Sequence, residues 1–133
     1  MKYVYPAVFS PDEGKILVSV PDLPGLNTFG DDLPEALYMA KDAIEMWLWD
    51  AENKHEEIPV PSAISAMGQY YETPDDFASL VAADTDEYRR LTDKRAVKKT
   101  LSIPSWLNEM AEKANAPFSQ ILQQGLKSYL NIS

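Results

Sequence analysis

The fold of this chain is decided by residues 94–133, KRAVKKTLSIPSWLNEMAEKANAPFSQILQQGLKSYLNIS. A short alternating segment is followed by Pro104, a helical pattern, a break at 115–117 and a second helical pattern. Alternation with a period of two is typical of a strand, and apolar residues three and four positions apart are typical of a helix. The sequence therefore predicts strand, helix, turn and helix, in too few residues to form a core alone.

The predicted tail has apolar surfaces that need a cover. The strand places Val97, Leu101 and Ile103 on one face and Lys98, Thr100 and Ser102 on the other. We expect Ser105 to cap the first helix and Ser119 to cap the second. Each helix carries an apolar stripe too wide to leave in water, so we expect a homodimer formed through this tail. The stripes are Trp106, Leu107, Met110, Ala111 and Ala114, and then Ile121, Leu122, Leu126, Tyr129 and Leu130.

The segments VKKTLSIP (97–104) and WLNEMAEKANAPFSQILQQGLKSYL (106–130) together resemble a ribbon-helix-helix DNA-binding domain. In that family two chains pair their strands into an antiparallel ribbon that enters the major groove of DNA. The resemblance implies that Lys98, Thr100 and Ser102 face the bases, and that Phe118, Ser119 and Gln120 offer backbone N–H groups to a phosphate. The strand has no arginine or asparagine for bidentate base contacts, so base reading is weak or is shared with DNA shape. The alternative is an edge strand with solvated lysines that serves only to dimerise.

Charge divides the chain into an acidic body and a basic tail. Residues 94–133 contain six basic and two acidic side chains, a net +4, while the whole chain carries −9. Residues 1–93 therefore carry −13. A basic tail attracts a polyanion that an acidic body repels, so we expect nucleic acid to bind the tail and a basic partner to bind the body. The alternative explanation is that the acidic surface only keeps the protein in solution.

Composition limits the class of protein. A length of 133 residues fits one ordinary domain, or a small domain and a dimerisation module. The absence of cysteine excludes disulfides, a thiol nucleophile and cysteine-ligated zinc. No run of about eighteen apolar residues exists, and residues 1–14 lack the apolar stretch of a signal peptide. We therefore expect a cytoplasmic protein with no membrane partner.

Residues 1–50 predict three strands and a helix. Residues 3–9 and 15–20 are rich in β-branched and aromatic side chains around a Pro-Asp-Glu-Gly turn, which indicates a hairpin, and a short third strand is predicted at 26–29. Asp32 stands three residues before Glu35, as in a capping box, and predicts a helix from there to about residue 50. We expect the helix to pack on the sheet through its apolar stripe. The stripe comprises Leu33, Ala36, Leu37, Ala40, Ile44, Trp47 and Leu48.

The remainder of the body is less regular. Residues 58–64 contain two prolines and predict a loop or an extended edge, and residues 54–73 match no pattern as a whole. Residues 78–83 are apolar enough for a fourth strand. Residues 84–93 are expected to be a charged link that leads to the tail.

The body also resembles a known family. Tyr3 and Tyr5 on the first strand, VPDLPGL (20–26), FGDDLPEAL (29–37) and AKDAIEMWLW (40–49) are similar to the HicB antitoxins. The resemblance implies a truncated ribonuclease-H-like domain that binds and blocks HicA, a small mRNA-cleaving toxin with a double-stranded-RNA-binding-like fold. Some members add a ribbon-helix-helix module, which residues 94–130 match. The expected fold is α+β: a three- to four-stranded sheet with one packed helix at 1–93, followed by a dimeric ribbon-helix-helix module at 94–133.

The function implied is that of an antitoxin in a type II toxin–antitoxin system. Such a protein neutralises a HicA-like toxin and represses its own operon by binding operator DNA. The acidic body then supplies the candidate toxin-binding residues Asp22, Asp31, Asp32, Asp84, Asp86 and Glu87. The alternative is a ribbon-helix-helix transcriptional regulator whose N-terminal domain senses a ligand or oligomerises, with no toxin partner.

The positions of the acidic residues are inconsistent with catalysis of the ribonuclease H type. Two-metal cleavage of a phosphodiester needs several carboxylates that converge on the metals, one of them usually in the first central strand. Residues 3–9 contain no acid, and the acids of the body lie in turns and at a helix cap. His55 is the only histidine and has no second histidine at metal-ligand spacing. We expect no catalytic residue, no metal and no cofactor.

Overall fold

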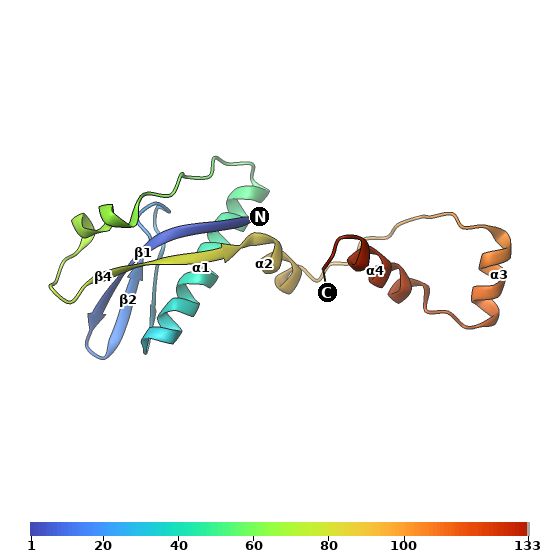
Figure 1. Cartoon of the computed structure of the whole chain (residues 1–133), viewed down its shortest axis with the longest axis horizontal. Coiled ribbons are helices and arrows are strands. Elements are labelled where there is room, and N and C mark those ends of the chain that lie inside the picture. The colour runs from blue at the N-terminus through green and yellow to red at the C-terminus, as the bar shows by residue number, and fades with distance from the viewer. Residues whose placement is uncertain (133) are drawn as a thin grey trace. The chain divides into compact units, whose positions relative to one another are not determined.

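The computed structural model describes residues 1–132, and the chain divides into a first unit, Met1–Arg95, and a second unit from Ala96 onward. The first unit contains β1 (Lys2–Asp12), β2 (Lys15–Ser19), β3 (Asn27–Gly30), α1 (Leu33–Asn53), the 3-10 helix η1 (Ile64–Tyr70), β4 (Phe77–Asp84) and α2 (Thr85–Thr92) (Figure 1). The second unit contains α3 (Ser105–Lys113) and α4 (Phe118–Tyr129). Among the described residues, no helix combines the length and the apolar character that a membrane span requires.

The four strands form one antiparallel sheet in the order β3-β2-β1-β4. β1 is paired on both sides: Phe9 lies opposite Val18 of β2 and opposite Phe77 of β4. The predicted strands of the body are confirmed, with ends that differ by at most three residues. The α+β class is likewise confirmed.

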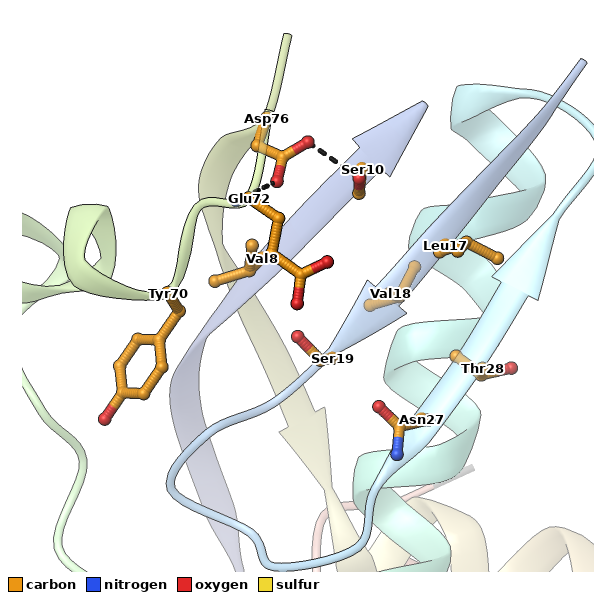
Figure 2. Close-up of a pocket in the computed structure, with 10 residues that line it drawn as sticks. All are labelled: Val8, Ser10, Leu17, Val18, Ser19, Asn27, Thr28, Tyr70, Glu72 and Asp76. Carbon is orange, nitrogen blue, oxygen red and sulfur yellow. Dashed lines mark hydrogen bonds between the residues drawn. The ribbon is translucent and has the colours of Figure 1, made fainter. Parts of the chain in front are cut away.

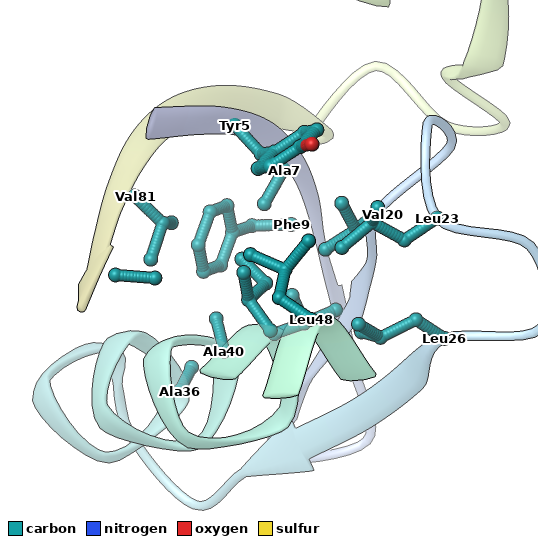
Figure 3. Close-up of a cluster of buried hydrophobic side chains, with 13 residues drawn as sticks. Tyr5, Ala7, Phe9, Val20, Leu23, Leu26, Ala36, Ala40, Leu48 and Val81 are labelled. Carbon is teal, nitrogen blue, oxygen red and sulfur yellow. The ribbon is translucent and has the colours of Figure 1, made fainter. Parts of the chain in front are cut away.

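α1 covers one face of the sheet and closes the main core with it. The buried side chains come from alternate residues of β1, from β2 and β4, and from one stripe of α1 (Figure 3). That stripe begins with small residues, since Ala36 and Ala40 are fully buried. It is narrower than predicted, because Leu33 and Leu37 remain 41% and 36% exposed.

η1 covers part of the other face of the sheet. It contacts β1 and β4, and its Met67 is only 1% exposed. Pro6 and Val8, on the same face of β1, are also buried. The sequence did not predict η1 because a short 3-10 helix has neither the alternation of a strand nor the period of an α-helix.

α2 replaces the charged link predicted for 84–93. Its start is fixed by Asp84, whose carboxylate accepts hydrogen bonds from the backbone N–H groups of Asp86 (3.0 Å) and Glu87 (3.4 Å). Tyr88 of α2 packs on Trp49 of α1, with ring centroids 5.8 Å apart. The density of charge concealed the helical period, but an aspartate followed by acids in a first turn is itself a helix-start signal.

Two predicted helix caps in the second unit are wrong. α3 begins at Ser105 and α4 at Phe118, so Pro104 and Pro117 occupy the cap positions and neither helix has a side-chain cap. A capping side chain needs the extended backbone of the residue before the helix. Ser105 and Ser119 lie inside the first turns and cannot act in this way.

The predicted break between these helices is confirmed. Asn115 has a left-handed backbone, with φ of 53°, and its N–H donates to the carbonyl of Glu112 at 3.0 Å. The next N–H, from Ala116, donates to the carbonyl of Ala111 at 3.0 Å. This pair of bonds is a Schellman motif, which satisfies the last carbonyls of a helix and turns the chain.

Residues 97–103, predicted as a strand, pair with no other segment in the described part of the chain. A β-strand needs a neighbour to satisfy its N–H and C=O groups. The second unit offers no other strand within residues 96–132, so in the predicted ribbon the neighbour comes from a second copy. The ribbon stays a prediction.

Gly30 and Asp32 define the tight connection from β3 into α1. Asp32 caps α1 as predicted: its Oδ1 accepts the backbone N–H of Glu35 at 2.9 Å. A Cβ atom at Gly30 would lie 2.3 Å from the backbone N of Ala36 and 2.7 Å from its Cα. Only glycine therefore leaves room for α1 to begin directly beside the sheet.

Replacing Gly30 by alanine should lower the free energy of unfolding by about 2 kcal/mol, because the new methyl group meets rigid helix backbone. Gly68→Ala is the matched control, since a Cβ there meets nothing within 4 Å. Denaturant unfolding of both variants measures the difference. Equal stability of the two would contradict the close approach of α1.

Candidate functional site

The acidic residues predicted to bind a partner lie at three places in the first unit. Asp22 is in the turn between β2 and β3, and Asp31 and Asp32 precede α1. The other three, at the end of β4 and the start of α2, are Asp84, Asp86 and Glu87. The structure brings this last group together but does not join all six residues into one cluster.

Asp22 has a structural role. Its Oδ2 accepts the backbone N–H of Ser62 at 2.8 Å, and its Oδ1 accepts the Ser62 hydroxyl. The same segment is held a second time, because the Tyr5 hydroxyl donates to the carbonyl of Pro59. Asp22 thus fastens the segment that leads from α1 to η1.

The two acids before α1 differ in availability. Asp32 is occupied as the helix cap, whereas Asp31 forms an exposed ion pair with Lys15 at 2.9 Å. The hydrogen bond and the charge of Asp31 raise the pKa of Lys15, whose Nζ also lies 5.0 Å from the centre of the Phe29 ring. An exposed ion pair contributes little to stability, so Asp31 can exchange Lys15 for a basic group of a partner.

The acids around the start of α2 are partly free. Asp84 is engaged as the cap, and its pKa is lowered: burial opposes the charged form, but the N–H groups of Glu87 and Asp86, the Met1 ammonium group and Lys2 together outweigh burial. Asp86 forms an ion pair with the Met1 ammonium group, but its side chain is 74% exposed, and Glu87 is half-buried. Asp86 is therefore the most available acid of this group.

Glu45 lies beside the candidate acids at the start of α2, and the sequence analysis did not identify it. Although charged, it is 4% exposed on α1, where its carboxylate binds Lys41 Nζ at 2.9 and 3.1 Å. The same carboxylate accepts the backbone N–H of Asp84 at 2.8 Å. Glu45 thus ties the end of β4 to α1, and its charge is compensated as a buried charge must be.

A groove of about 420 Å³ lies on the outer face of the sheet, beside the end of η1. Figure 2 shows Ser19 and Asn27 along one side of it and Tyr70 and Glu72 along the other. None of the six candidate acids lines this groove. The groove therefore belongs to a different part of the surface from the predicted acidic site.

Asp76 holds the chain in place at one end of this groove (Figure 2). The hydroxyl groups of Thr73 (2.6 Å) and Ser10 (2.7 Å) and the backbone N–H of Glu72 (2.8 Å) donate to its carboxylate. These bonds, that of Thr73 foremost, lower the pKa of Asp76 from 3.8 to about 2. A carboxyl with a depressed folded-state pKa stabilises the fold above its unfolded pKa and loses that effect as the pH falls through its folded pKa.

Asp76→Asn should therefore flatten the pH dependence of stability between about pH 4 and pH 2, the window set by the shift of its pKa. It should also lower stability at neutral pH, because an amide accepts these donors less well. Urea unfolding at a series of pH values measures both effects. Asp75→Asn, an exposed neighbour, is the control, and identical pH profiles for the two variants would count against the role of Asp76.

The predicted DNA-contacting residues are all solvent-exposed in the second unit. Lys98, Thr100 and Ser102 lie in the unpaired segment before α3. The first hydrogen bond of α4 runs from Ile121 N to Pro117 O at 3.0 Å. The N–H groups of Phe118, Ser119 and Gln120 therefore have no partner within the helix, as an anion site at a helix start requires.

The second unit has no core of its own. No side chain within residues 96–132 is buried. The apolar stripes of the two helices are exposed to solvent, since Trp106 is 63% exposed and Leu126 is 52% exposed. Leu101, in the segment before α3, is 62% exposed. A surface of this kind marks an interaction site.

No group of three or more His, Asp or Glu side chains within residues 1–132 is arranged to hold a metal ion. His55 is exposed and has a left-handed backbone, with φ of 55°, just after α1. It belongs to the turn that ends the helix, because its N–H donates to the carbonyl of Glu52 at 3.1 Å.

The chain has relatives among known proteins. A family described as the HicB-like antitoxin of bacterial toxin–antitoxin systems matches residues 5–125. An uncharacterised 14.9 kDa protein from the rep-hol intergenic region of Haemophilus phage HP1 is 31% identical over 104 residues, which are 78% of this chain and 75% of that protein.

Two solved structures are similar over nearly the whole chain. A chain of a toxin–antitoxin complex from Streptococcus pneumoniae is 28% identical with a TM-score of 0.61, and the match covers 97% of this chain and 99% of that one. The antitoxin HicB of Burkholderia pseudomallei has a TM-score of 0.55 at 20% identity, over 96% of each chain. At that identity the second likeness shows the fold alone.

The architecture is thus that of a two-unit antitoxin, with an α+β body and a helical C-terminal unit. The chain belongs to the HicB-like antitoxin family, which confirms the resemblance predicted from its sequence. It is an antitoxin of a toxin–antitoxin system and not an enzyme.

Proposed function

We propose that the first unit binds and neutralises a small, basic, mRNA-cleaving toxin of the HicA type, and that the second unit represses the operon by binding operator DNA as a dimer. The observation that carries the proposal is the match, over nearly the whole chain, to a member of a toxin–antitoxin complex. The charge division supports it further, since the two functions call for partners of opposite charge.

The toxin is expected to be basic because it must bind RNA, and the body that meets it carries −13. Within the body, Asp22, Asp32 and Asp84 are held by internal hydrogen bonds. Asp31 and Asp86 are exposed and are held only by ion pairs, with Lys15 and with the Met1 ammonium group, and Glu87 lies beside Asp86. Among the six candidates we therefore favour these three for toxin contacts.

The dimer is supported by the bare apolar surface of the second unit. Three apolar residues of its extended segment, Val97, Leu101 and Ile103, are 81%, 62% and 47% exposed. A second copy would cover them and at the same time supply the missing strand neighbour. In that arrangement Lys98, Thr100 and Ser102 face the major groove, and the start of α4 meets a phosphate.

The toxin half is tested by co-expressing the chain with the neighbouring reading frame. A short basic protein encoded there should co-purify with the full chain, and its affinity should fall as salt is added, because exposed charges are screened. Calorimetry at two ionic strengths measures this. Absence of any complex would favour the alternative of a plain transcriptional regulator.

The DNA half is tested on the extended segment. Thr100→Ala should weaken binding to the operator and leave scrambled DNA almost unchanged, because a lost base contact costs roughly 1–3 kcal/mol at the correct site only. Lys99→Ala is the control: alternation places it on the other face, so it should weaken all DNA about equally and lower the salt slope by at most about one.

Both variants must first sediment as dimers, like the unmodified chain. Binding to the operator and to scrambled DNA is then measured for each. If the two substitutions reduce both affinities in the same proportion, the segment does not read bases.

A further inference from the structure

β4 is an edge strand with none of the usual protections. It spans eight residues, FASLVAAD, with no proline and no charge before its last residue. The other edge strand, β3, is only four residues long. Long uncharged edges invite pairing with another strand, and proteins normally shorten, charge or cover them. β4 is therefore the edge at which pairing with another strand is expected.

The hydrogen-bond register identifies which backbone groups of β4 are open. Beyond the end of the ladder, Thr85 N donates to Met1 O at 3.0 Å, in the same register that sets Val81 opposite Tyr5. Hydrogen-bonded pairs alternate along an antiparallel ladder. Phe77, Ser79, Val81 and Ala83 therefore bond to β1, while Ala78, Leu80, Ala82 and Asp84 point their N–H and C=O groups away from it.

A contact outside the ladder agrees with this assignment. Asp84 N donates to the Glu45 carboxylate at 2.8 Å, so its N–H does point away from β1. Glu45 thereby closes the last position of the edge. The Leu80 carbonyl has a weak contact with the Ser79 hydroxyl at 3.3 Å. Within residues 1–132, no backbone hydrogen bond joins the outward groups of Ala78, Leu80 and Ala82 to another segment.

The open edge is uncharged in the middle and acidic at both ends. Asp75, which is exposed, precedes the strand. Asp86 and Glu87 follow it at the start of α2. An extended segment that added to this edge would fit best with small or apolar residues in its centre and basic side chains before and after them.

The same charges argue against a second copy of this chain as the occupant. Antiparallel pairing of two β4 edges would set Asp86 and Glu87 of one copy near Asp75 of the other. Like charges brought together in this way disfavour the pairing. A basic partner gains attraction at both ends instead.

We infer that the partner of the first unit docks by adding an extended, basic-flanked segment as a fifth strand along Ala78, Leu80 and Ala82 of β4. The inference rests on the proposed function and specifies how the toxin is held. Main-chain hydrogen bonds supply the affinity, and Asp86, Glu87 and Asp75 select basic side chains.

The test uses the full chain and, as probe, the protein encoded by the adjacent reading frame. Ala82→Pro removes one outward N–H while the ladder to β1 stays intact, a position at which an edge strand tolerates proline. It should weaken binding of the probe at least about tenfold. Leu17→Ser is the matched control, because Leu17 is 44% exposed on β2, away from this edge, and should change binding less than about twofold.

Hydrogen exchange of the unmodified chain gives a second measurement in case the proline variant fails to fold. The amides of Ala78, Leu80 and Ala82 should exchange fast in the free chain and slow down when the probe binds. The amides of Ser79, Val81 and Ala83 should be protected in both states, as ladder donors to β1.

The outcomes distinguish failure of the proposed function from failure of the edge inference. If the probe does not bind the unmodified chain, the proposed function fails and the edge inference fails with it. If the probe binds the unmodified chain and the Ala82→Pro variant with equal affinity, only the edge inference is wrong. The same holds if the outward amides exchange as fast with the probe bound as without it. Outward amides already protected in the free chain, increasingly so with concentration, would mean that a second copy occupies the edge.

Discussion

The structure of the first unit depends on β1 being buried on both faces and paired on both sides. Tyr5, Ala7 and Phe9 face α1, while Pro6 and Val8 lie on the side that η1 covers. A proline is normally excluded from a central strand because it lacks an N–H. Pro6 is tolerated because its pair with Leu80 falls between hydrogen-bonded pairs, and because the pairing with β2 extends only as far as Val8. With β1 enclosed, the open edges of the sheet are necessarily β3 and β4, and the surfaces left for a partner follow from that.

Elements with a strong period were predictable from the sequence, and elements defined by hydrogen bonds were not. The strands around Val18 and Val81, and the helix capped by Asp32, have the alternation or the spacing that their faces require. α2 was missed because its first turn is built from acids that serve the cap of Asp84 rather than a core. The expected caps at Ser105 and Ser119 failed because prolines already occupy the positions before those helices. Burial of Glu45 could not be anticipated, since it depends on where the backbone of Asp84 arrives.

The same distinction applies to the candidate site. Charge alone predicts a basic partner for the body, but it cannot rank six acids that differ in their hydrogen bonds. Asp22 and Asp31 have the same side chain, yet one fastens a segment through Ser62 and the other is held only by an exposed lysine. A carboxylate committed to backbone N–H groups cannot turn to a partner without leaving those donors unsatisfied. The tertiary structure therefore decides which acids remain available, and sequence composition decides only their sum.

The outer edge of β4 and residues 97–103 have no strand neighbour in the described part of the chain, and the charges around them have opposite sign. The edge of β4 lies between carboxylates, whereas residues 97–103 contain Lys98 and Lys99 and follow Lys94 and Arg95. In the proposed dimer, pairing two basic segments brings lysines together, which weakens association, and a polyanion that neutralises these charges strengthens it. DNA binding and pairing are then linked, since a ligand that binds only the paired form stabilises it. In the proposed function, the acidic edge of β4 disfavours a polyanion and the basic segment disfavours a basic protein, so the charges beside each segment select its ligand. In that arrangement the two partners bind separate parts of the chain and do not compete.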